Sequence, residues 1–151
     1  MVTISDQQKQ QASAWFHQLR DEIVTSFQQL ENDHADGSMA EMPAGKFEVT
    51  TTQRQSDDGS DAGGGLMSVL RGGRVFEKVG VNVSTVYGRL GDQAQAAMRA
   101  RPGLSDIADD PRFWASGISL VAHMQNPHCP AVHLNTRMFW TPKAWWFGGG
   151  S

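Results

Sequence analysis

The chain has 151 residues, of which 39% are hydrophobic and 19% charged, a composition that fits one folded domain rather than a disordered or membrane-embedded chain. The formal net charge of −3 argues against a general nucleic-acid binder, and no apolar run reaches the roughly 18 residues that a membrane span requires. The single cysteine, Cys129, allows no internal disulfide, and the first residues show no signal sequence, so we expect a cytoplasmic protein.

Residues 4 to 30 are predicted to form one long amphipathic helix. Ser5 and Gln8 resemble a capping box at its start. The apolar residues of this segment recur at three-and-four spacing: Ala12, Trp15, Phe16, Leu19, Ile23, Phe27 and Leu30. We expect this stripe to pack on a core. Residues 31 to 45, including His34, have the composition of a loop.

Residues 46 to 53 alternate and predict a strand with Phe47, Val49 and Thr51 on one side. The next stretch, SDDGSDAGGG at residues 56 to 65, is predicted to be a flexible polar loop. It lacks the Gly-Lys-Ser/Thr ending of a phosphate-binding loop, so it does not indicate nucleotide binding.

Residues 66 to 70 predict a short strand, and the glycines within residues 71 to 74 predict a hairpin turn. A return strand is expected to start near Val75. Residues 92 to 101 predict a short helix, which Pro102 and Gly103 end.

Two strands are predicted in the last third of the chain. Residues 117 to 123 form the first, with Ile118, Leu120 and Ala122 on one face. Residues 124 to 132 contain two prolines and are expected to connect to the second strand, at residues 131 to 140. The simplest arrangement is an antiparallel pair. The whole pattern favours an α+β fold built on antiparallel strands.

One face of this strand pair carries polar side chains. His133, Asn135 and Arg137 share a face of the second strand, and pairing brings Ser119 and His123 to the same side, whereas Thr136 points to the other. Arginine binds carboxylates in a bidentate manner, and a histidine can move a proton near neutral pH. Together these groups fit a small, multiply anionic substrate on which a proton is transferred.

Each of these residues also has a structural interpretation. His123 could be a buried histidine with satisfied hydrogen bonds, and Arg137 could pair with an acidic neighbour. His123 and His133 could instead be two ligands of a metal, although no cysteine or carboxylate accompanies them at a typical ligand spacing.

Three blocks of the sequence carry a family resemblance. They are GGGLMSVLRGGRVFEKVGVNVSTVYG, GISLVAHMQNPHCPAVHLNTRMFW and WWFGGGS, in this order, and they cover most of residues 63 to 151. They resemble the oxygen-dependent coproporphyrinogen-III oxidases of haem biosynthesis. The pattern H-x-x-N-P-x-x-P-x-x-H-x-N-x-R, which begins at His123, and the WWFGGG block at its end are the most specific parts.

The resemblance implies an oxidoreductase that converts coproporphyrinogen III to protoporphyrinogen IX by oxidative decarboxylation of two propionates to vinyl groups. It implies molecular oxygen as the co-substrate and no organic cofactor. His133 matches the family's catalytic proton donor, and the substrate-contacting positions fall on Ser119, Asn135, Thr136 and Arg137. His123 and His133 match positions that some bacterial members are described as using for a divalent metal; we expect none here.

The resemblance also implies a homodimer built on a large, mostly antiparallel sheet flanked by helices. Its dimer contact matches ten consecutive residues: Val75, Phe76, Glu77, Lys78, Val79, Gly80, Val81, Asn82, Val83 and Ser84. Because the WWFGGG block continues into further sheet in the family, we expect residues 1–151 to be the N-terminal part of a longer catalytic domain, truncated within the sheet and inactive alone. The alternative is a non-catalytic fragment that binds a tetrapyrrole or serves as a scaffold.

Overall fold

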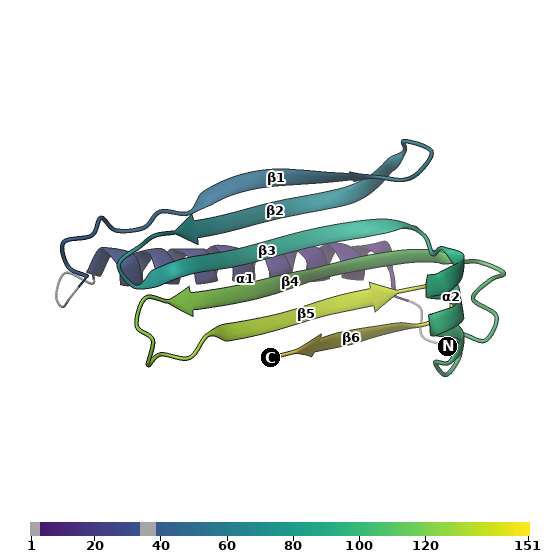
Figure 1. Ribbon diagram of the computed structural model, residues 1–151. Helices are drawn as coiled ribbons and strands as arrows, with labels where there is room; N and C mark the ends of the chain where they lie inside the picture. Colours follow the sequence, from purple (N-terminus) through teal and green to yellow (C-terminus); the bar gives the residue numbers. More distant parts are fainter. Residues whose placement is uncertain (1–3, 34–38) are drawn as a thin grey trace.

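A computed structural model describes residues 4–33 and 39–151, whose strands form one antiparallel sheet (Figure 1). Its six strands lie in the order β1-β2-β3-β4-β5-β6, so each strand pairs with its neighbours in sequence. The α+β class predicted from sequence is confirmed. The elements are α1 (Asp6–Asp33), β1 (Glu48–Gln55), β2 (Asp61–Arg71), β3 (Phe76–Arg89), α2 (Asp92–Arg99), β4 (Arg112–Met124), β5 (Val132–Trp140) and β6 (Trp145–Gly150).

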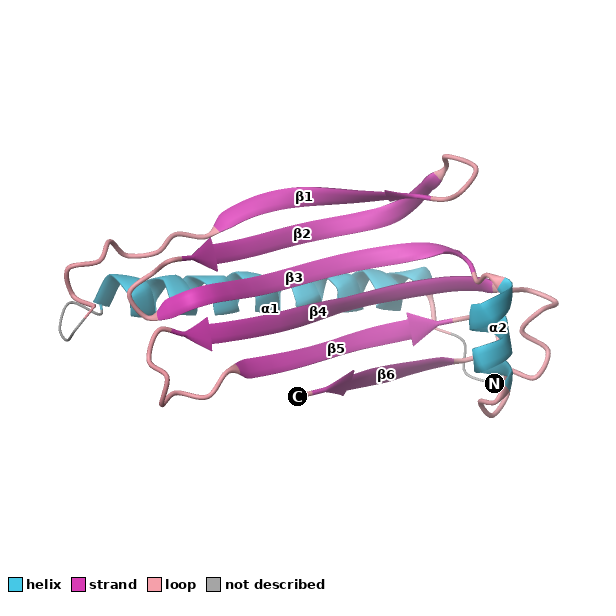
Figure 2. Cartoon of the chain, viewed as in Figure 1, coloured by secondary structure: helices cyan, strands magenta, loops and turns pink. Residues whose placement is uncertain are grey.

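The two helices lie on opposite sides of the sheet. Helix α1 runs along one face, where it packs against β3 and β4, and α2 crosses one end of the strands on the other face (Figure 2). We call the face away from α1 the open face. None of the described helices is long and apolar enough to cross a membrane.

Helix α1 begins where the sequence predicts. The Gln8 backbone N–H donates to Ser5 Oγ at 3.3 Å and the Ser5 N–H donates to Gln8 Oε1 at 2.8 Å, so the capping box is confirmed. The helix extends to Asp33, three residues beyond the predicted end. Residues 34–38 of the predicted loop, His34 among them, lie outside the described part of the chain.

The apolar stripe of α1 is narrower than predicted. Phe16 is buried against the sheet, whereas Trp15 is 52% exposed and Leu30 is 50% exposed. Neighbouring residues on a helix point about 100° apart, so only one member of the Trp15–Phe16 pair can face the sheet. In the same way Glu31, rather than Leu30, takes the buried position at the end of the helix.

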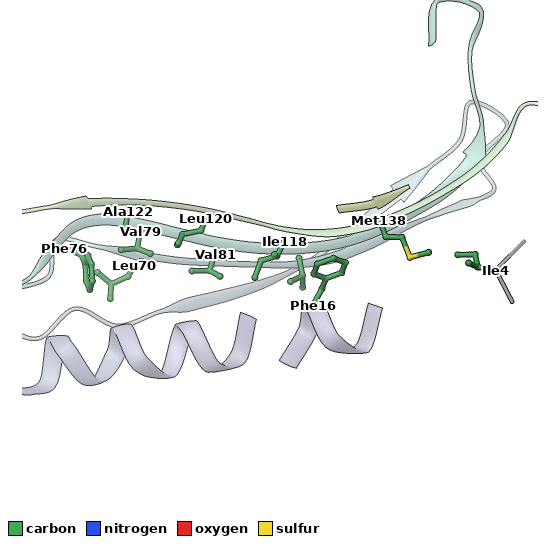
Figure 3. Packing of buried hydrophobic residues seen from close by; sticks show 11 residues of the cluster. Ile4, Phe16, Leu70, Phe76, Val79, Val81, Ile118, Leu120, Ala122 and Met138 are labelled. Carbon is green, nitrogen blue, oxygen red and sulfur yellow. The ribbon is translucent and has the colours of Figure 1, made fainter. Parts of the chain in front are cut away.

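The main core lies between α1 and the sheet. Figure 3 shows Phe16 pointing from the helix toward the strands, and the strands contribute every second residue in return. The predicted face of β4 is confirmed, since Ile118, Leu120 and Ala122 are all buried. The strand residues labelled in Figure 3 are Leu70, Phe76, Val79, Val81, Ile118, Leu120, Ala122 and Met138.

The prediction of a loop at residues 56–65 is wrong over its second half, because β2 begins at Asp61 and runs through the glycines. A Cβ atom built on Gly64 would lie 2.1 Å from the Thr52 carbonyl oxygen, and one on Gly65 would lie 1.9 Å from that of Val83. Glycine is therefore required at these positions, because the backbones of the neighbouring strands leave no room for a Cβ atom. The glycine-rich composition of residues 56–65 had instead suggested a flexible segment.

A buried carboxylate joins the end of α1 to the turn between β2 and β3. Glu31 is fully buried and accepts four backbone hydrogen bonds, at 2.7 to 2.9 Å, from the N–H groups of Gly45, Arg74, Val75 and Phe76. Burial alone would raise the pKa of Glu31, but these four donors outweigh it and the pKa is lowered from its ordinary value of 4.5. The ionised carboxylate thus holds the turn against the helix.

Replacing Glu31 with Gln should lower the free energy of unfolding by about 2–4 kcal/mol, because an amide keeps one acceptor oxygen and turns an N–H group toward buried donors. Urea unfolding measures this loss. The exposed Glu41 gives the matched control, since Glu41→Gln changes the same charge without a buried partner. Equal stability of the two variants would contradict the role of Glu31.

The pH dependence of this effect follows from the lowered pKa. A carboxylate with a lowered pKa stabilises the fold fully above its unfolded-state pKa, and this stabilisation is lost as pH falls through the folded-state value. The stability difference between the native protein and Glu31→Gln should therefore be largest near neutral pH and shrink below about pH 4.5. Denaturant titrations across this range measure the difference, and one that grew on acidification would be inconsistent with an ionised Glu31.

Candidate active site

The antiparallel pairing of β3, β4 and β5 brings the predicted site residues into two rows on the open face. Ser119 lies between Asn82 and Asn135 in the first row. Gly117 lies between Ser84 and Arg137 in the second. The predicted antiparallel pairing of the two C-terminal strands is confirmed. Adjacent strands lie about 4.8 Å apart and successive rows about 7 Å apart.

These rows surround a hollow of about 340 Å³ in the open face, which we call the central hollow. Its lining contains four of the predicted site residues, Ser119, Asn135, Thr136 and Arg137, and no aspartate or glutamate. The complete lining is Asn82, Ser84, Val86, Ala115, Gly117, Ile118, Ser119, Asn135, Thr136 and Arg137. A hollow with one guanidinium and several neutral polar groups suits an anionic ligand.

Glycine gives the central hollow its floor. A Cβ atom on Gly117 would lie 2.5 Å from the Thr136 carbonyl oxygen and 2.7 Å from Arg137 Cβ, so no larger residue fits between β4 and β5. Gly148 of β6 pairs with Arg137 on its other side. The Arg137 side chain therefore has a glycine on each neighbouring strand and keeps open space beside it.

Arg137 is exposed and not engaged in a structural ion pair. Within residues 4–33 and 39–151, the ion pairs with a carboxylate are made by Lys9, Arg20, Arg112 and Lys143, not by Arg137. The interpretation of Arg137 as a structural partner of an acidic neighbour is thus not realised in the described chain. Its guanidinium is available to bind a carboxylate.

Thr136 contributes differently from its neighbours. It pairs with Ile118, whose side chain is buried beneath α1, and strand alternation puts the Thr136 side chain on that same face. Its part in the lining of the central hollow therefore comes from its backbone. Asn135 and Arg137, by contrast, direct their side chains to the open face.

The two histidines lie on the open face beside the central hollow. His133 pairs with Val121, and His123 follows two residues along β4, opposite Lys78. Such diagonal neighbours are about 7–8 Å apart. Both side chains are exposed, so His123 is not the buried structural histidine considered above. His133 is outside the lining of the central hollow but one row from Asn135.

The arrangement of possible metal ligands is sparse. In the described part of the chain, no group of three His, Cys, Asp or Glu side chains gathers as a metal site would. His123 and His133 share a face and could supply at most two ligands from these residues. Any further ligand would have to come from elsewhere.

An aromatic cluster that sequence reasoning missed lies beside one end of the central hollow. Phe139 stacks with Phe113, at 5.8 Å between ring centroids, and with Trp146, at 4.9 Å. Leu104 and Ile107, from the segment after α2, are buried against this cluster. The apolar end of the central hollow, at Val86 and Ala115, lies in the row of Phe139.

The segment expected to form a dimer contact, residues 75–84, is mostly an inner strand. Both edges of β3 are paired, and its odd-numbered residues Val79, Val81 and Val83 are buried beneath α1. Another molecule could meet its exposed residues, which are Glu77, Lys78, Asn82 and Ser84. Two of these, Asn82 and Ser84, line the central hollow, a role that sequence reasoning missed. Strand alternation indicates that Asn82 and Ser84 share a face of β3. Only their pairing with Ser119 and Gly117 shows that this face borders the central hollow.

Comparison with known proteins decides the family. The family model described as coproporphyrinogen III oxidase matches residues 11–151. The chain belongs to this family. The resemblance on which the sequence analysis relied is thereby confirmed.

The most similar relatives named here are oxygen-dependent coproporphyrinogen-III oxidases. One from Rickettsia bellii (strain RML369-C) is 44% identical over 138 residues, which cover 91% of this chain and 44% of the relative. One from Rickettsia felis is 43% identical over 142 residues, covering 94% of this chain and 46% of the relative. The chain spans about half the length of the curated relatives it matches.

The close approach of β5 to Gly117 predicts an effect on stability that can be measured without substrate. Gly117→Ala should lower the free energy of unfolding by about 1–3 kcal/mol, because its Cβ would press on the backbone of β5. Gly148→Ala is the control, since a Cβ there would make only an ordinary contact, 3.9 Å from Trp146 Cδ1. Thermal unfolding of both variants measures the difference, and equal melting temperatures would show that β4 and β5 are not closely packed at Gly117.

Proposed function

We propose that this protein performs the reaction for which its relatives are named, the oxygen-dependent oxidation of coproporphyrinogen III to protoporphyrinogen IX. The observation that carries the proposal is the gathering of Arg137, Asn135 and Ser119 around one hollow in a member of this family. We propose that residues 1–151 form the N-terminal part of the catalytic domain, that the enzyme is a cytoplasmic homodimer, and that it uses no organic cofactor.

Arg137 is the residue proposed to hold a substrate propionate. Its guanidinium is exposed at the central hollow without a carboxylate partner among the described residues, and its planar donors match a carboxylate. Asn135 and Ser119, in the adjacent row, offer an amide and a hydroxyl to the pyrrole N–H groups or to a carboxylate oxygen. Thr136 contributes its backbone. These groups bind and orient the substrate.

His133 is the proposed proton carrier. Conversion of each propionate to a vinyl group releases carbon dioxide, one proton and two electrons. Dioxygen accepts the electrons from both propionates together with these protons and two more from solvent, and gives two molecules of water. An imidazole one row from Asn135 is placed to exchange a proton with a substrate anchored at the central hollow. We propose that His133 has this role, and that His123 supports it from the diagonal position.

The proposal is tested by oxygen-dependent turnover of the full-length gene product. Coproporphyrinogen III is supplied with and without oxygen, and protoporphyrin fluorescence is followed after oxidation of the product. We expect oxygen-dependent product and a loss of about 10²-fold or more in kcat for His133→Ala. His128→Ala, an exposed histidine in the loop before β5, is the matched control.

Other outcomes have distinct meanings. Binding of coproporphyrinogen without oxygen-dependent product would favour the alternative of a non-catalytic tetrapyrrole-binding protein. Loss of turnover on chelation, restored by one divalent ion, would contradict the expectation that no metal is bound and would favour His123 and His133 as metal ligands.

The role of Arg137 is tested by affinity. Arg137→Ala should weaken binding of coproporphyrinogen III by about 10- to 100-fold, because a charge-assisted bidentate contact is lost. Arg54→Ala, an exposed arginine on the distant strand β1, is the control and should bind as the native protein does. Unchanged affinity of Arg137→Ala would exclude the proposed contact with a propionate.

A further inference from the structure

Asn82 and Ser84 form the side of the central hollow that faces Arg137. Asn82 and Asn135 lie on either side of Ser119, and Ser84 and Arg137 lie on either side of Gly117. With adjacent strands about 4.8 Å apart, the two sides are about 10 Å from each other. A planar ring lying over Ser119 and Gly117 would thus meet β5 at one edge and β3 at the other.

The polar groups of Asn82 and Ser84 are not used by the fold. Both side chains are exposed on an inner strand whose backbone is already paired on both sides. In the described part of the chain, neither the Asn82 amide nor the Ser84 hydroxyl makes a hydrogen bond. Their donors and acceptors therefore remain available to a ligand.

The two sides of the central hollow differ in charge. The β5 side carries the Arg137 guanidinium, whereas the β3 side carries a neutral amide and a neutral hydroxyl. The next row, at the apolar end of the hollow, holds Val86 and Ala115. A ligand that bears its carboxylate at one edge and N–H groups further in would match this difference. A pyrrole ring with one propionate arm is such a group.

We propose that Asn82 contacts the tetrapyrrole directly, hydrogen-bonding it on the side away from Arg137, with Ser84 beside it as a second hydrogen-bonding side chain. This inference rests on the proposed function and adds a third strand to the substrate site. It gives Asn82 and Ser84 a role beyond the dimer contact expected of residues 75–84.

The test compares two substitutions of Asn82 by their effect on ligand affinity. The probe is coproporphyrin III, an oxidised porphyrin with the same four propionates, bound to the full-length gene product and followed by fluorescence. Asn82→Ala removes the hydrogen bond and should weaken binding about fivefold. Asn82→Asp keeps the shape but turns a negative charge toward an anionic ligand, so it should weaken binding about tenfold or more.

The order of these effects separates ligand contact from a structural role. A residue that only supports the fold would tolerate the isosteric Asp better than Ala, which is the reverse of the expected order. Thr50→Asp is the control, because Thr50 lies in the same row on β1, two strands from Asn82, and receives the same charge. At about 10 Å this charge is largely screened by 0.15 M salt, so the affinity should change less than about twofold.

The outcomes are distinguishable. Native protein that binds coproporphyrin III, together with an Asn82→Asp variant of equal affinity, would overturn this inference and leave the proposed function intact. Native protein that binds no porphyrin would overturn both. Sedimentation of Asn82→Asp should show the native oligomeric state, and a changed state with unchanged affinity would assign Asn82 to the dimer contact instead.

Discussion

The one-sided packing of α1 against the sheet is the constraint on which the rest of the structure depends. Because side chains alternate along a strand, each residue that packs against α1 sends its neighbours to the open face. A register slip of one residue in β4 would expose Ile118 and Leu120 and bury Ser119. The positions of the polar residues of the central hollow are therefore fixed by hydrophobic packing on the opposite face.

Directional polar contacts hold α1 in its position along the sheet. Apolar packing alone is non-directional and would allow the helix to slide. Near its middle, Arg20 donates from Nε and Nη2 to Ser68 Oγ, at 2.9 and 2.7 Å. Nearer its start, Ser13 Oγ lies 2.9 Å from Thr85 Oγ1, which lies 2.9 Å from Ser116 Oγ.

Glu31 provides the third contact, at the end of the helix, although a negative charge is unfavourable near a helix C-terminus. Its four backbone donors outweigh that cost, as its lowered pKa indicates. With contacts near the start, middle and end, α1 has one allowed register on β2, β3 and β4. The position of α1 thereby determines which strand residues are buried beneath it and which lie on the open face.

Local sequence pattern was sufficient to predict most helices and strands, but not which of their residues make contacts between strands. The alternation in β4 and β5 and the capping box at Ser5 are short-range features, and the structure confirms them. The glycines at residues 63–65 were misread because their use depends on how closely strands β1 and β3 approach, which no local pattern contains. Asn82 was missed for the same reason, since only the pairing with Ser119 brings it to the site.

The central hollow depends on glycines held in a rigid setting. Glycine inside a strand usually weakens it, because it adds backbone freedom and offers no side chain for packing. Gly117 lies on an inner strand with paired neighbours on both sides, so its backbone is fixed and the space above it cannot be filled by local collapse. The stacked rings of Phe113, Phe139 and Trp146 fix the adjoining end of the same rows. Arg137 and Asn135 therefore face a space whose shape exists before any ligand arrives, which is the condition under which a few polar contacts give the greatest affinity.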